Sequence, residues 1–317
     1  MIEDILKRGN VFKLVCGAGN EDLEEVENLV ALYSKAGCEI FDLSANPDVV
    51  DAAKRGLAHA GNLQNRYLCV SVGIKGDPHV SKAVINDNCK KCGKCEILCP
   101  QNAVKYFKVN SSKCIGCGRC VQACNAGAIK KRDMAKDLKE ILPPIIKKGI
   151  DCIELHACGG DENDALEKWK DICTMFNGLK SLCIDRSKLG NDGVLKRVEK
   201  FCEKEKIIVQ ADGYPMSGGQ DDYKSTLQAV AMAEIIQNSK LPVYLLISGG
   251  TNSKSYELSK LCGVDVNGVA VGSFARKIVK NYISQKDFLQ NEERFNKALE
   301  IAKNLVNTVK YEYSDNR

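Results

Sequence analysis

The chain has 317 residues, of which 44% are hydrophobic, with 46 basic against 41 acidic side chains. It is long and apolar enough for a sizeable core, about two domains or a single α/β barrel, which indicates a globular protein. Residues 1–8 are charged and lack the apolar core of a signal peptide, and no apolar run approaches the ~20 residues of a membrane helix. We therefore expect a cytoplasmic protein with no membrane partner.

Two strand-and-helix units and a third strand are predicted before residue 80. Apolar runs at residues 11–19, 38–43 and 67–72 read as strands, and the first of them ends at glycines. Helical periodicity follows at residues 21–36 and 47–60. After the third run, however, the loop at residues 73–79 leads into a cysteine-rich segment and not directly into a helix.

Residues 88–130 contain the same cysteine pattern twice, with spacings x2, x2 and x3. This pattern is typical of two 4Fe–4S clusters, in which the first three cysteines hold one cluster and the fourth holds the other. Zinc is the alternative, although structural zinc sites usually use two separated cysteine pairs. The predicted ligand sets are Cys89, Cys92, Cys95 and Cys124 for one cluster, and Cys114, Cys117, Cys120 and Cys99 for the other.

The same segment is strongly basic. Between residues 82 and 132 there are eleven lysines and arginines, against Asp87 and Glu96 alone. Such a face steers acidic proteins toward it, so we expect a redox partner of the ferredoxin or flavodoxin type, or a signalling partner. A solvated lysine-rich surface is the alternative. No nucleic-acid partner is expected, because the lysines accompany neither a recognition motif nor interleaved aromatic residues.

Strands and helices alternate again beyond the cysteine-rich segment. A helix is expected at residues 135–148, broken or kinked by Pro143 and Pro144. Five more strands are predicted at residues 151–156, 180–185, 206–210, 243–248 and 268–271. Helices are predicted at residues 166–176, 193–205, 223–238 and 255–262, and long helices over 274–311.

Eight apolar strands alternating with helices predict a (β/α)8 barrel of the TIM type, with a doubly wound sheet as the alternative. The expected division is residues 1–83 for the first part of the barrel, 84–132 for a ferredoxin-like module with two 4Fe–4S clusters, and 133–317 for the second part with the C-terminal helices. The module then lies in the loop after the third strand, on the face where barrel enzymes carry their active sites.

The loops after the seventh and eighth strands have the composition of a barrel phosphate site. We expect flavin mononucleotide (FMN) or another phosphorylated ligand there, although the glycines by themselves also suit tight turns. The predicted binding residues are Gly249, Gly250, Thr251, Gly272, Ser273 and Arg276.

Four polar residues near other strand ends are candidate catalytic groups facing the same pocket. Lys75 and His156 are candidate general acids and Asp212 a general base. Cys158, like Cys16, is a candidate thiolate nucleophile or additional metal ligand. A loop-stabilising hydrogen bond is the alternative role for each. The other seven cysteines outside the cluster motifs are expected to be small buried hydrophobes.

Several motifs together, in this order, resemble the light-dependent-period family, iron–sulfur proteins of circadian input in cyanobacteria. They are residues 13–18, the two cysteine motifs, residues 212–218, 249–252 and 268–277. The resemblance implies a redox-responsive iron–sulfur protein that reports redox state to signalling partners, and supplies no catalytic residues. Two functions remain open: an oxidoreductase that passes electrons between the clusters and a ligand in the barrel, and a redox sensor or adaptor.

Overall fold

Eight parallel strands form a closed barrel in the computed structural model, which describes residues 1–310 except 18, 76–80, 135–136, 160 and 214–219. The order around the barrel is β1-β12-β11-β10-β9-β8-β3-β2. Barrel strands that follow one another in the chain are therefore neighbours in space. The predicted TIM-type barrel is confirmed. The strands are β1 Val11–Val15, β2 Ile40–Ser44, β3 Tyr67–Gly73, β8 Cys152–His156, β9 Leu179–Ile184, β10 Ile208–Asp212, β11 Tyr244–Ser248 and β12 Gly268–Val271.

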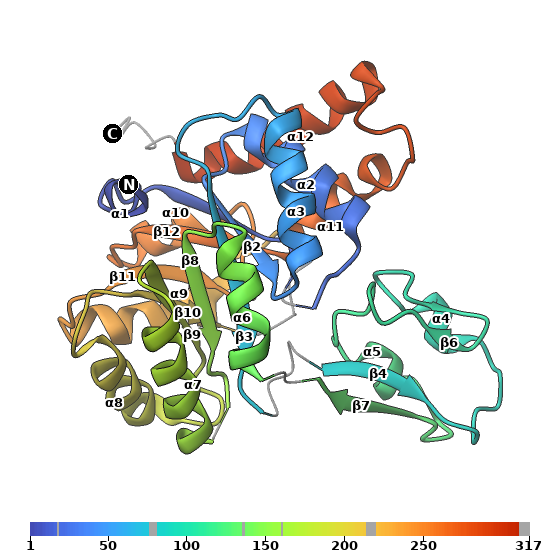
Figure 1. The fold of residues 1–317 in the computed structure, drawn as a ribbon, viewed down its shortest axis with the longest axis horizontal. Coiled ribbons are helices and arrows are strands. Elements are labelled where there is room, and N and C mark those ends of the chain that lie inside the picture. The colour runs from blue at the N-terminus through green and yellow to red at the C-terminus, as the bar shows by residue number, and fades with distance from the viewer. Residues whose placement is uncertain (18, 76–80, 135–136, 160, 214–219, 311–317) are drawn as a thin grey trace.

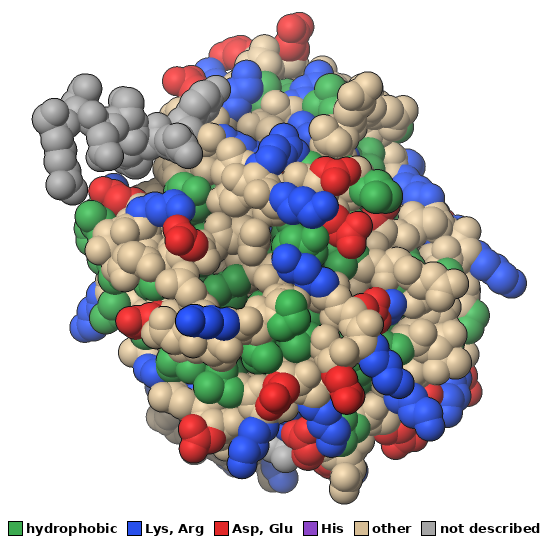
Figure 2. Space-filling view, turned by 90° about the vertical axis from the view of Figure 1, so that its left-hand side faces the viewer, with side chains coloured by type: hydrophobic (Ala, Val, Ile, Leu, Met, Phe, Trp, Pro, Cys, Tyr) green, Lys and Arg blue, Asp and Glu red, His purple; other side chains and the backbone are tan. Residues whose placement is uncertain are grey.

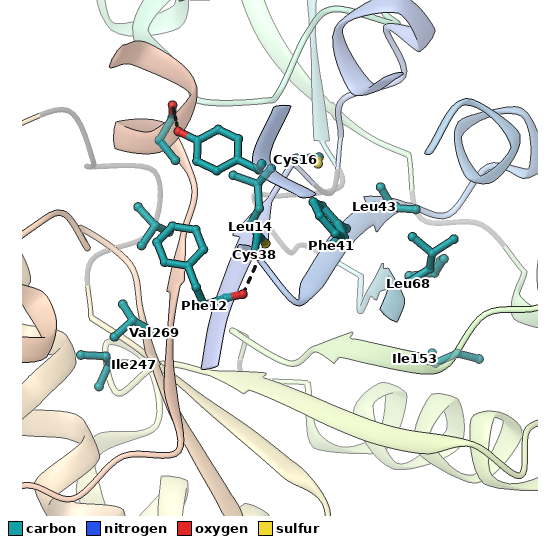
Figure 3. Packing of buried hydrophobic residues seen from close by; sticks show 14 of the residues in the cluster. Phe12, Leu14, Cys16, Cys38, Phe41, Leu43, Leu68, Ile153, Ile247 and Val269 are labelled. Atoms are coloured by element: carbon teal, nitrogen blue, oxygen red, sulfur yellow. Dashed lines mark hydrogen bonds between the residues drawn. The ribbon is translucent and has the colours of Figure 1, made fainter. Parts of the chain in front are cut away.

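Helices cover the outside of the barrel (Figure 1). Side chains pointing outward from β1 and β2, such as Phe12, Leu14 and Phe41, are fully buried against this helical layer (Figure 3). Among the described residues, no helix is both long and apolar enough to cross a bilayer. The helices are α2 Leu23–Ala36, α3 Pro47–His59, α6 Leu138–Lys147, α7 Glu162–Met175, α8 Gly190–Cys202, α9 Tyr223–Asn238, α10 Ser255–Leu261, α11 Ser273–Ile283 and α12 Glu292–Lys310.

The barrel interior is apolar at one end and polar at the other. Inward-facing residues near the strand starts, including Val11, Ile40 and Cys152, form one apolar cluster with the short helix α1 Ile2–Leu6. Because inward positions alternate along each strand, the next inward residues lie one layer higher. Those positions hold charged and amide side chains, so the polar part of the interior lies toward the carboxyl ends of the strands.

Helix α6 runs through Pro143 and Pro144 and does not end before them, in contrast to the expected break. Both prolines are exposed, while Leu142 and Ile145 are buried on the opposite side. The free energy gained by burying this apolar face offsets the cost of the two backbone hydrogen bonds that the prolines cannot donate.

The cysteine-rich module lies between β3 and α6, beside the barrel (Figure 1). Its strand β4 Ser81–Ile85 pairs antiparallel with β7 Ile129–Asp133, so the insertion leaves and returns at one place. Between them lie α4 Lys94–Ile97, α5 Arg119–Gln122 and the small ladder of β5 Val104–Lys105 with β6 Lys108–Val109.

The sequence repeat of the module is also a structural repeat. Gly93 precedes α4 and Gly118 precedes α5, each with a left-handed φ of 77° that favours glycine. Cys99 and Cys124, which end the two motifs, each accept a hydrogen bond at Sγ from the backbone N–H four residues later. The two halves therefore present their cysteines on equivalent backbone.

Buried and charged contacts hold the module against the loop between β1 and α2. Lys82 Nζ donates to the carbonyls of Cys114, at 2.7 Å, and Gly19. Glu21 N donates to Ser112 O at 2.8 Å. Lys82 is only 8% exposed. It is thus part of this contact, and the exposed basic face of the module consists of the other lysines and arginines.

Candidate functional site

Four cysteines of the module line one cavity, next to Ala83 and Val104. They are Cys99, Cys114, Cys117 and Cys120. Burial raises the pKa of the Cys120 thiol to about 11, and the neighbouring Cys114, Cys117 and Cys99 add to the shift. Four converging thiols in an apolar setting suit one iron–sulfur cubane, whose iron ions take thiolates as ligands. This is the set that the sequence pattern predicts for the second cluster.

The other predicted set lies toward solvent. Cys95 is buried and shares the module's small core with the half-buried Cys124, while Cys89 is half-buried and Cys92 is exposed. Burial raises the pKa of the Cys95 thiol, and Cys89 contributes to this shift. The backbone N–H of Lys91 donates to Cys89 Sγ at 3.4 Å. Such N–H donors stabilise negative charge on sulfur and tune cluster potentials.

A buried ionic network fills the middle layer of the barrel. Lys13 Nζ lies 2.5 Å from Glu154 Oε2 and 3.1 Å from Asp42 Oδ2. Glu154 also accepts hydrogen bonds from Ser181 Oγ, at 2.6 Å, and Gln210 Nε2, at 3.2 Å. All of these side chains are nearly inaccessible to solvent. The network fixes Glu154 below the mouth of the barrel.

The charges of this network stabilise one another against burial. Burial by itself lowers the pKa of Lys13, but the carboxylates of Asp42 and Glu154 outweigh it and raise that pKa well above its usual value. For Glu154, burial is outweighed by Lys13 and His156, and the pKa is lowered. Burial raises the pKa of Asp42. Lys13 and Glu154 therefore stay charged at neutral pH.

Above the network lies a pocket at the carboxyl ends of the strands. All six predicted phosphate-site residues line it, together with His156 and Asp212. Gly249 and Gly250 have left-handed φ angles of 73° and 80°. Arg276 is 8% exposed and donates from Nη1 to Val15 O at 2.5 Å. A buried guanidinium and the N-terminus of α11 give this part of the pocket positive potential, which suits an anion.

The module contributes to the pocket directly. Ile115, next to Cys114, lines both the barrel pocket and the cavity of Cys99, Cys114, Cys117 and Cys120. This inner cysteine set and the mouth of the barrel therefore share a lining residue.

The remaining candidate catalytic residues lie in three different environments. Lys75 is exposed, its backbone N–H donates to Asp164 Oδ2 at 2.6 Å, and it does not line this pocket. Cys158 is buried, with Sγ 4.0 Å from Cys183 Sγ at the pocket wall. Cys16 belongs to the core between barrel and helices (Figure 3), where burial raises its thiol pKa well above the usual value. That pKa does not suit a thiolate nucleophile.

Comparison with known proteins identifies the family. A family model described as the LdpA Fe-S cluster-binding domain matches residues 87–135, and one described as the light dependent period A C-terminal domain matches residues 144–308. The protein "Light dependent period A" of Synechococcus elongatus is 31% identical over 300 residues, which cover 86% of this chain and 82% of that protein. The chain belongs to the light dependent period A family.

Membership of the light dependent period A family confirms the predicted resemblance. It also supports an iron–sulfur cofactor, since the matched cluster-binding domain includes all eight cysteines of the two motifs.

Solved structures resemble this member of the light dependent period A family in fold alone. The YdjI aldolase of Escherichia coli K12 has a TM-score of 0.51 at 9% identity, over 97% of this chain and 94% of that one. Tryptophan synthase from M. tuberculosis, in its aminoacrylate-bound form, has a TM-score of 0.50 at 10% identity, over 97% and 98% of the two chains. Both matches support the barrel architecture.

Three polar residues of the barrel interior were missed by the sequence reasoning. Lys13 lies among the apolar residues of β1, and Glu154 lies between Ile153 and Leu155 of β8, which is a readable sign of a buried charge. Gln210 ends a predicted strand without any such sign. Cysteine burial was predicted less well, because Cys262 is exposed and Cys173 half-buried. Cys183 is buried as expected, yet it lines the pocket.

Proposed function

We propose that this protein is a redox protein with two 4Fe–4S clusters, which passes electrons between a protein partner and a phosphate-containing ligand or flavin in the barrel mouth. The observation that carries the proposal is the position of Ile115, which borders both the inner cysteine cavity and the barrel pocket. When bound, the clusters would supply one-electron chemistry, which requires such proximity between donor and acceptor.

The two cysteine sets support a relay because they differ in exposure. In the inner set, which is Cys99, Cys114, Cys117 and Cys120, the residues Cys114 and Cys120 are buried. In the outer set, which is Cys89, Cys92, Cys95 and Cys124, the residue Cys92 is exposed. Ile97, close to Cys92 in α4, is 86% exposed. Together with the exposed Leu98 beside it, Ile97 offers apolar contact area to a protein partner. A partner would dock at the outer set, and the ligand would bind near the inner one.

The residues of the barrel mouth support a phosphate as the anchored group. Arg276 and the N-terminus of α11 offer positive charge and N–H donors, and Gly249 and Gly250 leave the backbone open to an anion. His156 and Asp212 line the same pocket, where they can exchange protons with a ligand as its charge changes.

A redox sensor or adaptor is the second candidate. The name of the Synechococcus relative refers to a light-dependent period, which suits a signalling role. The exposed apolar side chains of the module, Ile97, Leu98 and Tyr106, also suit a signalling partner that responds to the state of the clusters. In that case the barrel pocket need not bind a redox ligand.

Native mass spectrometry of protein purified without oxygen tests the first candidate, by counting iron and any co-purified small molecule. We expect eight irons and a flavin or phosphorylated ligand in the wild type. Ser273→Asp places a carboxylate at the first residue of α11, where the helix tolerates an acid but a phosphate is repelled. It should remove the ligand and keep the iron, while the neutral isostere Ser273→Asn should keep both.

Two outcomes separate the candidates. A ligand that remains at full occupancy in Ser273→Asp would show that the phosphate site is misplaced. Eight irons with an empty barrel in the wild type would contradict electron transfer to a bound ligand and favour the sensor.

A further inference from the structure

Three potential metal ligands meet beside the barrel pocket, away from the cluster motifs. Cys158 Sγ lies 4.0 Å from Cys183 Sγ, and Cys183 Sγ lies 3.7 Å from Asp212 Oδ2. All three ligand atoms lie within 4.8 Å of one another, and all three residues are buried. A tetrahedral zinc ion with Zn–S of about 2.3 Å and Zn–O of about 2.1 Å separates two sulfurs by about 3.8 Å and sulfur from oxygen by about 3.6 Å. The observed spacing is close to this geometry.

We infer that Cys158, Cys183 and Asp212 bind a single zinc-class metal ion. Two thiolates favour zinc over the hard cations, which prefer oxygen ligands alone. The inference does not depend on electron transfer or on the proposed phosphate ligand. It gives Cys158 the role of a metal ligand and gives Cys183 a role beyond filling the core.

The surroundings hold the ligands in place. Arg197, which is 1% exposed, donates from Nη1 to Ala157 O at 2.8 Å and Gly159 O at 2.9 Å, the carbonyls on either side of Cys158. Ala157 N donates in turn to Cys183 O at 2.8 Å. These bonds join the loop of one ligand to the strand of the other. Metal sites require such support, because ligands must be positioned before the ion binds.

Gly249 makes room for the third ligand. A Cβ atom at this position would lie 1.7 Å from Asp212 Oδ1. Any other residue would displace the carboxylate from the place where it meets Cys183. The glycine therefore has a steric function here in addition to its left-handed turn.

Among the residues that the structure describes, these three ligands are joined by no fourth one, and the remaining coordination position lies on the pocket side. Cys183 and Asp212 both line the pocket, as does Gln210. Gln210 is 2% exposed, and its Oε1 has no hydrogen-bond partner among the described residues. A water molecule on the metal would supply the missing donor. Three protein ligands with an open fourth position are typical of zinc ions that act on a substrate and do not only stabilise a fold.

Titration of the full-length, cluster-containing protein with Zn²⁺ tests the inference, with a chromogenic chelator as competitor and elemental analysis of the bound metal. We expect one zinc per chain in addition to the cluster iron. Cys183→Ser should weaken zinc binding by more than about 100-fold. Loss of a residue that only orients a metal ligand by a hydrogen bond costs about 10–100-fold, and loss of a ligand itself should cost more. Asp212→Asn should weaken it as well. Cys202→Ser changes a buried cysteine of α8 and should leave zinc binding unchanged.

Circular dichroism of each variant reports whether the barrel is folded, and cluster absorption reports whether the module is. Loss of zinc in a variant with both signals unchanged supports the site. X-ray absorption at the zinc edge should show two sulfur ligands. Four sulfurs would place the zinc in a cluster motif and overturn the inference. So would a Cys158–Cys183 disulfide in the anaerobic protein, or equal zinc binding by the wild type and Cys183→Ser.

Discussion

Lys13 is the positive centre of an ionic network that is buried in the barrel interior. Its partner Glu154 lies 141 residues away in the chain, and the two side chains are 1% and 0% exposed. Removing one member of a buried pair leaves the other charge without compensation, which costs about 3–5 kcal/mol. By fixing Glu154, Lys13 also fixes the contact between Glu154 Oε1 and His156 Nε2, which lie 3.0 Å apart at the pocket wall. Stability and the mouth of the barrel are therefore coupled at these residues.

Glu154→Gln should lower the free energy of unfolding by about 3 kcal/mol at pH 7, because Lys13 then keeps only Asp42. The pKa of Glu154 is lowered in the folded protein. Its stabilisation is therefore complete above the unfolded pKa of 4.5 and decreases as the pH falls below it, by at most about 1.4 kcal/mol per pH unit. The difference between wild type and variant should shrink accordingly. Urea unfolding followed by fluorescence of Trp169, the single tryptophan, measures it.

Glu300→Gln, on the exposed side of α12, is the matched control and should unfold like the wild type at every pH. A difference between wild type and Glu154→Gln that stays constant from pH 7 to acid pH would contradict the assigned ion pair.

At the scale of elements, α6 shows how packing outweighs local preference. Pro143 and Pro144 remove two backbone donors from the middle of the helix, yet the helix continues to Lys147. The reason is its buried stripe of Leu138, Leu142 and Ile145, which contacts the rest of the barrel core. In α3, by contrast, Pro47 occupies the first turn, where no donor is lost.

Pro144→Ala should raise the free energy of unfolding by about 2 kcal/mol. Proline in a helix interior costs about 3 kcal/mol, and part of this gain is lost because alanine makes the unfolded chain more flexible. Pro47→Ala should instead lower the free energy of unfolding by up to about 1 kcal/mol, because only the flexibility effect remains. Urea unfolding of both variants measures the contrast, and a change of the same sign in both would refute this account of α6.

Across the whole molecule, exposed positive charge is concentrated on the cysteine-rich module. On the side of the barrel shown in Figure 2, basic and acidic side chains are interspersed. In the module, exposed lysines such as Lys90, Lys91 and Lys94 surround the exposed Cys92. The outer cluster site and the basic face therefore coincide, which orients an acidic partner toward the cysteines.

Lys94→Glu should slow reduction of the clusters by an acidic, reduced flavodoxin about tenfold at low ionic strength, because part of the attraction becomes repulsion. The effect should fade at about 1 M salt, where charges are screened beyond about 3 Å. Lys94 begins α4, so glutamate suits the helix there. Stopped-flow absorbance of the clusters measures the rate. Lys303→Glu, exposed on α12, is the control, and equal rates for both variants would exclude the basic face as the docking surface.

Features that depend on neighbours in the chain could be predicted without any structure. Apolar periodicity located the eight barrel strands, and the spacing of two cysteine motifs indicated the iron–sulfur module, because strand burial and cluster ligation both follow short repeats. The residues of the two glycine-rich loops line one pocket in the structure, since a barrel brings the ends of its strands together, while their role as a phosphate site stays a prediction.

Contacts between side chains across the barrel, by contrast, follow from the closed fold. It paired Lys13 with Glu154, brought Cys158, Cys183 and Asp212 together, and placed Ile115 of the module at the barrel mouth. It also left Lys75 exposed and buried Lys82. Closing the barrel joins residues far apart in the chain, and the inward or outward position of each follows from strand register, which spacing within one segment cannot specify.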